Sequence, residues 1–388
     1  MTVGQVHPPE WHEYLDPLTH KRVRQLTNST AEDYHLYFYN PSVTPDGKYL
    51  IFISERTGVS NLFRMDLQHG EIVQMTDARS VRAEYWPFTD SVTGVGACLP
   101  AIGNRGQEVF YFEGNDLFAV EVENLKQRQL LTLPVDRRPS MLQANLNGDT
   151  LVFATWDESL FMERSQRAYS GEHFPDENFY QETTSTIMRV AAETGQAEEV
   201  LHKEKFWINH VHVNPHNHDL ILFCHEYSTS PDRMWLLDVA NQKCAPIPGQ
   251  GADEWYEHEF WSADGQRVCF HGGLARDNTQ GFCGWCSADG ASYTKVYHST
   301  SGRAYAHYNL HPDGKTMITD GEARPGCISK VNLQDGRQEF EILCRHDSYT
   351  FGDDQRCHPH PSFTPDGRQV IFTSNRTGSS NIYLTDWN

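Results

Sequence analysis

Short apolar runs, each bounded by polar turn residues, recur along the whole chain. The clearest repeat spans Thr44–Leu67, where Thr-Pro-Asp-Gly leads into an apolar run, and a close copy spans Thr364–Asp386. Runs of this length between Gly, Pro and Asp clusters predict β-strands. The sequence shows no 3.6-residue apolar period of the kind that would indicate helices. The Asp-Gly and Asn-Gly steps tolerate positive φ and therefore predict hairpin turns.

Weaker copies of the same unit fill the space between these two. They turn at Asn104-Arg-Gly106, Asn147-Gly148, Asn217-His-Asp219, Asp264-Gly265 and Asp313-Gly314. Seven units with a mean period of about 50 residues, each of four strands, predict an all-β, seven-bladed β-propeller that forms one domain over residues 1–388.

The two ends of the chain are complementary. The last unit stops after its third strand, and Arg22–Thr27 matches the pattern of a fourth strand. We therefore expect this N-terminal strand to complete the last blade and close the ring, which removes an open sheet edge.

One unit carries a long insertion. Residues 157–184 lie between the second and third strands of blade three and are rich in aromatic and basic residues. This connection is expected on the face where the innermost strands begin. It is either a lid over the channel mouth or a self-packed surface loop.

Histidines occupy one repeat position in three consecutive blades. His258, His307 and His360 each lie six residues before the Asp of the following turn. That position opens the innermost strand, where all blades converge on the axis. His358, on the same face of the same expected strand as His360, and Gln355 lie beside it, and His210 and His212 lie near the matching place in blade four. Imidazoles with an amide oxygen suit a borderline divalent ion such as Mn, Fe, Co, Ni or Zn, so we expect a metal site; the alternative is a polar channel lining.

Arg233 stands where units one and seven have Asn61 and Asn381, at the start of the third strand on the histidine face. An arginine there is placed to bind a carboxylate, unless it forms a surface ion pair. Tyr37 and Arg82, near the first strands of blades one and two, are further candidates for the same mouth. Ordinary packing or a solvated charge is the alternative for both.

The net charge of −20 excludes nucleic acid and anionic membranes as expected partners. It leaves open an anionic small substrate, because a local cation can dominate a pocket. The chain has no apolar run long enough to span a membrane and no signal-peptide pattern, and its nine cysteines are scattered, so we expect a cytoplasmic protein.

Four motifs together resemble one known family, the oligogalacturonate lyases, which are seven-bladed propeller enzymes of pectin breakdown. They are Tyr34-His-Leu-Tyr-Phe-Tyr39, Phe223-Cys-His-Glu226 followed by Arg233-Met-Trp235, His258-Glu-Phe-Trp261, and Gln355-x-x-His358-x-His360 followed by Pro-Ser-Phe-Thr-Pro. The resemblance covers nearly the whole chain. It implies a Mn²⁺ ion held by His307, Gln355, His358 and His360, with His258 as catalytic base and Arg233 as the arginine that contacts substrate.

The resulting hypothesis is a metal-dependent lyase that cleaves short oligogalacturonides, such as digalacturonate, by β-elimination. His210, Tyr37 and Arg82 are the predicted additional substrate contacts. Two alternatives remain. One is the same chemistry on a different uronic-acid oligosaccharide, and the other is a non-catalytic propeller that binds a sugar or protein partner.

Overall fold

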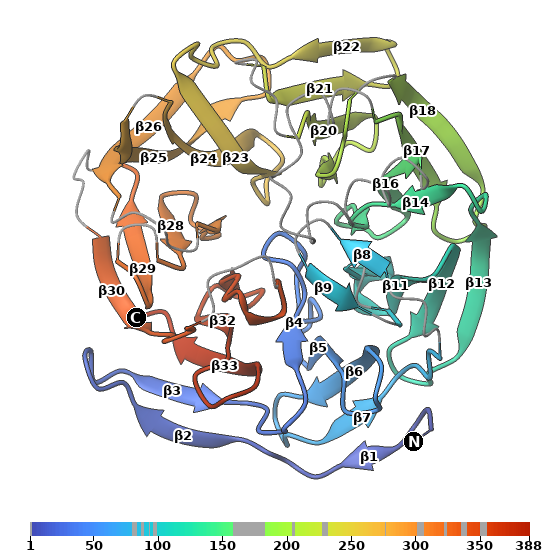
Figure 1. Cartoon of the computed structure of the whole chain (residues 1–388), viewed down its shortest axis with the longest axis vertical. Coiled ribbons are helices and arrows are strands. Elements are labelled where there is room, and N and C mark those ends of the chain that lie inside the picture. Colours follow the sequence, from blue (N-terminus) through green and yellow to red (C-terminus); the bar gives the residue numbers. More distant parts are fainter. Residues whose placement is uncertain are drawn as a thin grey trace.

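A computed structural model of the chain describes residues 2–79, 84–86, 89–92, 94–95, 99–157, 183–203, 206–226, 232–275, 277–300, 306–321, 324–334, 340–349 and 355–388. Within them, seven antiparallel sheets of four or five strands are arranged in a ring around one axis (Figure 1). This confirms the seven-bladed β-propeller. No helix among these residues is long and apolar enough to cross a membrane.

The strands of each blade run in chain order from the axis outward, with additions in blades one, three and seven. Blade one comprises β4 (Asp33–His35), β5 (Tyr49–Ser54), β6 (Asn61–Asp66), β7 (Ile72–Gln74) and β1 (Val6–His7). Blade two comprises β10 (Ala101–Gly103), β11 (Glu108–Glu113), β12 (Asp116–Glu121) and β13 (Gln127–Thr132). Blade three comprises β14 (Arg137–Pro139), β15 (Gln143–Ala144), β16 (Thr150–Asp157), β17 (Ser185–Ala191) and β18 (Ala197–Lys203). Blades four and five comprise β19 (Val211–Val213), β20 (Leu220–Cys224), β21 (Met234–Asp238) and β22 (Lys243–Pro246); and β23 (Glu254–Trp261), β24 (Arg267–Leu274), β25 (Asp277–Ser287) and β26 (Tyr293–Ser299). Blades six and seven comprise β27 (Tyr308–Leu310), β28 (Thr316–Thr319), β29 (Cys327–Asn332) and β30 (Phe340–Arg345); and β31 (Ser362–Phe363), β32 (Gln369–Ser374), β33 (Asn381–Asp386), β3 (Arg22–Gln25) and β2 (His12–Leu15). Outside the blades lie β8 (Glu84–Trp86), β9 (Thr89–Val92) and the 3₁₀ turns η1 (Asn104–Gly106) and η2 (Gln355–Cys357).

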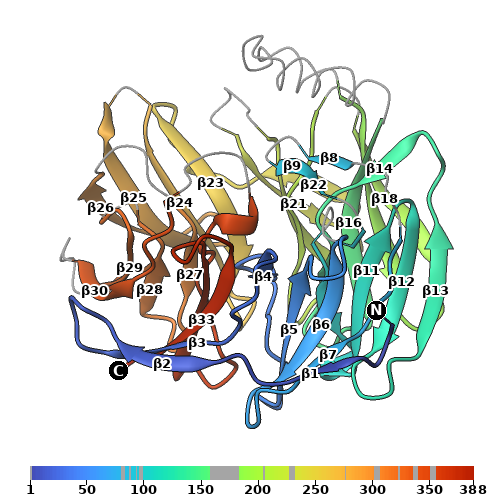
Figure 2. The ribbon, with the colours of Figure 1, turned by 60° about the horizontal axis from the view of Figure 1, so that its bottom comes forward.

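The ring is closed by the N-terminal segment, as predicted. β3 pairs with β33, the last strand of the chain, and Arg22–Gln25 supply the missing fourth strand of blade seven. Two further strands were not predicted. β2 pairs with β3 on the outside of blade seven, and β1 pairs with β7 on the outside of blade one. The segment therefore runs along the rim of both blades (Figures 1 and 2).

The core lies between neighbouring sheets, because each blade packs one face against the blade before it and the other against the blade after it. Phe52 and Met65 of blade one pack with Ile371 and Ile382 of blade seven, for example, in one continuous buried cluster. A second strand is therefore buried on both faces, which explains why its sequence is a continuous apolar run and does not alternate.

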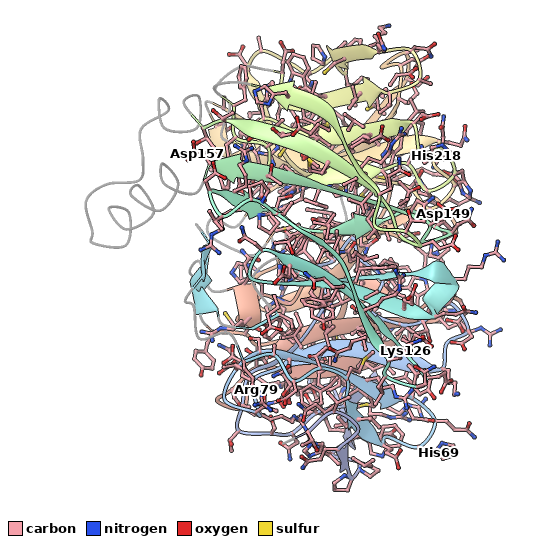
Figure 3. All side chains as sticks on the ribbon, turned by 90° about the vertical axis from the view of Figure 1, so that its right-hand side faces the viewer. His69, Arg79, Lys126, Asp149, Asp157 and His218 are labelled. Carbon is pink, nitrogen blue, oxygen red and sulfur yellow. The ribbon has the colours of Figure 1, made fainter. Side chains whose placement is uncertain are left out.

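The two faces of the disc carry different connections. The turns between first and second strands lie on one face, with Gly47, Gly265, Gly314 and Gly367 all near φ +70° as Asp-Gly turns require. Asp149 and His218 belong to such turns, and Asp157, from which the blade-three insertion departs, lies on the opposite face (Figure 3). The predicted insertion therefore leaves from the face where the innermost strands begin; its residues 158–182 lie outside the described part.

Candidate metal centre and catalytic site

A repeating backbone hydrogen bond fixes the register of the blades. In six blades, all but blade two among the described residues, an N–H at the end of the first strand donates to the carbonyl that opens the second strand, and the donors are Thr44, Asn145, Asn214, Ser262, His311 and Thr364. Four residues before these donors lie Asn40, Met141, His210, His258, His307 and His360, so the position is a histidine in blades four to seven. The predicted repeat position is thus correct, and His210 occupies it in blade four.

These histidines form a continuous row around the axis. Ring centroids are 5.9 Å apart between His210 and His258, 4.5 Å between His258 and His307, and 4.2 Å between His307 and His360. Phe38, from the loop that follows β4, lies 5.7 Å from His258 and 5.6 Å from His307 and is buried. The buried Phe38 ring therefore packs against the middle of the row.

Three of the predicted ligands converge. His307, His358 and His360 each offer one ring nitrogen within 4.8 Å of the others. The Nε2 atom of His360 and the Oε1 atom of Gln355 are buried and have no hydrogen-bond partner among the described residues. Burial, and next the neighbouring His307, hold the pKa of His360 well below its ordinary value, so its imidazole is neutral. Neutral imidazoles and a free amide oxygen are the donors that a borderline divalent ion takes.

The backbone that carries these ligands differs from the prediction. Gln355–Cys357 form the 3₁₀ turn η2, and β31 begins only at Ser362, so His358 and His360 do not share a strand. The reason is Pro359 and Pro361, which lack an N–H for sheet pairing and restrict the residues before them. His360 takes φ +46°, in the left-handed region that non-glycine residues rarely adopt.

Asp320 was not predicted from the sequence, yet it binds two of the predicted ligands. It follows β28 and is completely buried. Its Oδ1 accepts the His307 N–H at 2.8 Å, and its Oδ2 lies 2.7 Å from His307 Nδ1 and accepts the His360 N–H at 3.3 Å. This leaves Nε2 of His307 as the ring nitrogen that is available to a metal ion. The available signal was a charged residue at a second-strand position occupied by Ile53 and Thr373 in blades one and seven.

His258 lies on an irregular part of β23. The register shifts between Glu257 and Phe260, and His258 has φ +53°. Such a bulge re-aims side chains, and it lets the consecutive residues His258 and Glu259 both face the site. His258 Nδ1 lies 3.0 Å from the Ala306 carbonyl oxygen and 2.7 Å from His271 Nε2. Burial and then the neighbouring His307 hold its pKa well below the ordinary value.

Arg233 lies directly before β21, at the predicted start of a third strand. It is buried between two carboxylates: its Nε donates to Glu259 Oε2 and its Nη1 to Glu226 Oε1, both at 3.0 Å. Burial alone would lower the pKa of Arg233, but Glu226 and Glu259 hold it well above its ordinary value. Burial would likewise raise the pKa of Glu259, and Arg233 lowers it to about 2. Nη2 of Arg233 has no hydrogen-bond partner among the described residues.

The remaining predicted contacts have different outcomes. The centroid of the Tyr37 ring lies 4.7 Å from that of His360, 6.0 Å from that of His210 and 5.9 Å from that of His307. Tyr37 is buried, so it supports the histidine row, and its contact with substrate stays a prediction. Arg82 lies outside the described residues.

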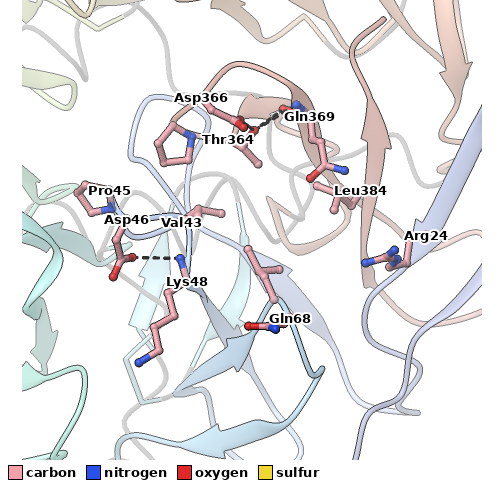
Figure 4. A pocket seen from close by; sticks show the side chains of 13 residues that line it. Arg24, Val43, Pro45, Asp46, Lys48, Gln68, Thr364, Asp366, Gln369 and Leu384 are labelled. Carbon is pink, nitrogen blue, oxygen red and sulfur yellow. Dashed lines mark hydrogen bonds between the residues drawn. The ribbon is translucent and has the colours of Figure 1, made fainter.

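A cavity of about 680 Å³ lies elsewhere, where blades one and seven meet at the turn face (Figure 4). Asp46, Lys48, Asp366 and Gln369 line it. It lies at the opposite end of the first strands from the histidines and contains none of the predicted site residues.

Comparison with known proteins agrees with this geometry. A family model described as oligogalacturonate lyase matches residues 163–387. This range is more than half of the chain and includes Arg233, His258 and all four predicted metal ligands. The chain belongs to the oligogalacturonate lyase family.

Curated relatives match over nearly full length. An oligogalacturonide lyase of Pectobacterium atrosepticum is 25% identical over 99% of this chain and 98% of its own, and an oligogalacturonate lyase of Dickeya dadantii is 24% identical with the same coverage. Among solved structures, an oligogalacturonate lyase in complex with manganese superposes with a TM-score of 0.82 at 24% identity, covering 100% of this chain and 98% of the other. The oligogalacturonate lyase of Vibrio parahaemolyticus gives the same TM-score at 23% identity, covering 100% and 99%. These structures share the fold of this oligogalacturonate lyase family member.

Proposed function

We propose that this protein cleaves short oligogalacturonides, such as digalacturonate, by β-elimination, with a manganese ion held by His307, Gln355, His358 and His360. The observation that carries the proposal is the convergence of three imidazoles beside a further histidine, His258, whose ring lies 4.5 Å from that of His307. The activity and metal named for the relatives and the solved structure above support it.

The reaction begins with removal of a weakly acidic proton. The C5–H of a galacturonate lies next to its carboxylate, and the resulting anion is stabilised when that carboxylate is neutralised. An ion held by His307, Gln355, His358 and His360 would supply positive charge at that carboxylate. As the base takes the C5 proton, the C4–C5 double bond forms and the C4–O bond breaks, and the departing oxygen takes a proton from water to become a hydroxyl of the released sugar.

His258 is the proposed base. The Ala306 carbonyl can only accept a hydrogen bond, so Nδ1 carries the ring proton in this arrangement and Nε2 keeps the lone pair that takes the C5 proton. The charge that develops on the imidazole is stabilised through Nδ1 by Ala306 and His271. A role for His258 as a further metal ligand is the alternative, since Glu257, His258 and His271 also form a candidate metal group.

Arg233 is the proposed carboxylate-binding residue. Two carboxylates occupy its Nε and Nη1, so Nη2 is the group it offers to substrate. Glu226 and Glu259 thereby hold the guanidinium in one orientation before substrate arrives, which reduces the entropy lost on binding.

The test is an assay of chelator-treated protein with digalacturonate, with and without added Mn²⁺, following the ultraviolet absorbance of the unsaturated uronate. We expect turnover that requires the metal and stops with EDTA. His258→Ala should lower kcat by about 10²- to 10⁴-fold, the typical contribution of a general base. His218→Ala, on an exposed turn of the other face, is the matched control and should have no effect.

Other results separate the alternatives. Bound metal without turnover of galacturonides, but with turnover of another uronide, would replace the substrate and keep the chemistry. Absence of both bound metal and turnover would refute the enzyme and favour a binding propeller.

A further inference from the structure

A second cluster of metal-binding side chains lies one blade further around the row. It consists of His210, His212 of β19 and Glu259 of β23, each of which offers one ligand atom within 4.8 Å of the others. None of the three belongs to the ligand set of His307, Gln355, His358 and His360. Two imidazoles and one carboxylate are a donor set that divalent zinc, iron and related ions use in proteins.

The cluster is buried and its polar atoms are unpaired. The exposed fractions of His210, His212 and Glu259 are 5%, 0% and 0%. Within the described part of the chain, Nδ1 of His210, both ring nitrogens of His212 and Oε1 of Glu259 have no hydrogen-bond partner. Buried polar atoms are almost always paired, so four such atoms at one place require an explanation, and a shared ion satisfies one from each residue.

The spacing of these atoms suits ligands better than hydrogen bonds. His210 Nδ1 and Glu259 Oε1 are 3.8 Å apart, which is too long for a hydrogen bond. Two ligands that each lie about 2.1 Å from an ion are at most about 4.2 Å apart. The observed distance lies inside that limit.

The surrounding charge favours a cation. Glu259 gives only its Oε2 atom to Arg233, and the same guanidinium also binds Glu226. Two carboxylates around one guanidinium leave one net negative charge in a buried region, where unbalanced charge is costly. A cation on the free Oε1 atom balances it.

We propose that His210, His212 and Glu259 bind a second divalent transition-metal ion, separate from the one assigned to His307, Gln355, His358 and His360. His210, which the sequence suggested as a substrate contact, becomes a ligand. Through Glu259 the second ion is linked to Arg233, so it also positions the guanidinium. The proposal does not depend on which uronide is cleaved.

The experiment is metal stoichiometry on the full chain, stripped with a chelator and dialysed against Zn²⁺ or Co²⁺. Wild-type protein should bind two ions per chain. His358→Ala, disabled at the first site, should keep one, His212→Leu should also keep one, and the double variant should bind none. The d–d absorption of Co²⁺ in the His358→Ala variant reports the second site directly.

Contrary results are equally clear. One ion in the wild type with none in His358→Ala would overturn the proposal, as would two ions in His212→Leu. The uronide assay is scored separately, so a wrong substrate leaves the stoichiometry intact. Because His212→Leu removes buried unpaired nitrogens, its metal-free form should melt no lower than metal-free wild type, which shows that lost binding is not lost folding.

Discussion

At the scale of single residues, the site depends on carboxylates that the repeat pattern does not display. Asp320 binds the backbone and ring of His307 and the backbone of His360, which come from two different blades. Burial would raise the pKa of Asp320, but His307 outweighs it and holds the pKa below the ordinary value. The residue is thus an anion that fixes the orientation of two proposed ligands.

Replacing Asp320 by Asn should weaken metal binding by about 10- to 100-fold, the usual effect of losing a carboxylate behind a ligating histidine. The amide keeps the size of the side chain but cannot act as a charged acceptor for Nδ1. The measurement is a metal titration of the chelator-treated variant. Asp313→Asn, in the exposed turn of the same blade, is the control, and equal affinities of the two variants would refute the role of Asp320.

The histidines were predictable and the carboxylates were not, for a physical reason. His258, His307 and His360 lie at a fixed distance from a turn whose chemistry is visible in the sequence. Asp320 and His271 contact them across a strand pair, and such partners follow from sheet register, which single-sequence patterns specify only weakly. Glu226 and Glu259 stand in recognisable motifs, but their shared partner, Arg233, depends on the packing of blade four against blade five.

At the scale of elements, the β2–β3 hairpin shows how a loop is attached to a neighbouring blade. Asp16, at its turn, accepts the N–H groups of Leu18 and Thr19 with Oδ1 and the N–H of Arg345 in blade six with Oδ2. Burial would raise the pKa of Asp16, but these hydrogen bonds, that from Arg345 first, make the net pKa lower than ordinary.

Asp16→Asn should therefore destabilise the protein by about 1.5–3 kcal/mol at neutral pH, the range for hydrogen bonds to a charged group. A lowered folded-state pKa stabilises fully above the unfolded-state value of about 3.9, and the contribution is lost as pH falls through the folded-state pKa. Urea unfolding measured from pH 7 downward should show that the difference in unfolding free energy between wild type and variant disappears below about pH 4. Glu13→Gln, an exposed change in the same hairpin, should change stability by less than about 1 kcal/mol. A difference in unfolding free energy that does not vary with pH would contradict stabilisation by the ionised Asp16 carboxylate.

β1 and β2 were not predicted because they carry little pattern. β1 has two residues, β2 has four, and both are mostly exposed. Strands on an outer rim pack one side at most, so no apolar alternation marks them. β3 was predictable because Val23 within it and Leu26 just after it are buried against blade seven or its neighbours.

At the scale of the whole molecule, the stability of the ring depends on the pairing of β3 with β33, which closes it. Deletion of residues 2–27 removes β3 and exposes the edge of β33, so we expect a protein that aggregates, as open sheet edges do. Deletion of residues 2–8 removes only β1 and keeps β2 and β3, and should leave a soluble, folded protein. Size-exclusion chromatography and urea unfolding of the two variants are the measurements, and equal behaviour would show that closure by β3 is dispensable.

The pairing of β3 with β33 also determines the order in which parts of the molecule can fold during synthesis. Blade seven contains residues 22–25 and residues 381–386. The first segment leaves the ribosome early in synthesis and the second leaves it late. The proposed metal ligands lie in blades six and seven, so the early blades can form as they emerge while the N-terminal strand waits without its partner. The proposed ligand set in blades six and seven is therefore completed last, and a nascent chain would not hold an ion there in final form before the ring is complete.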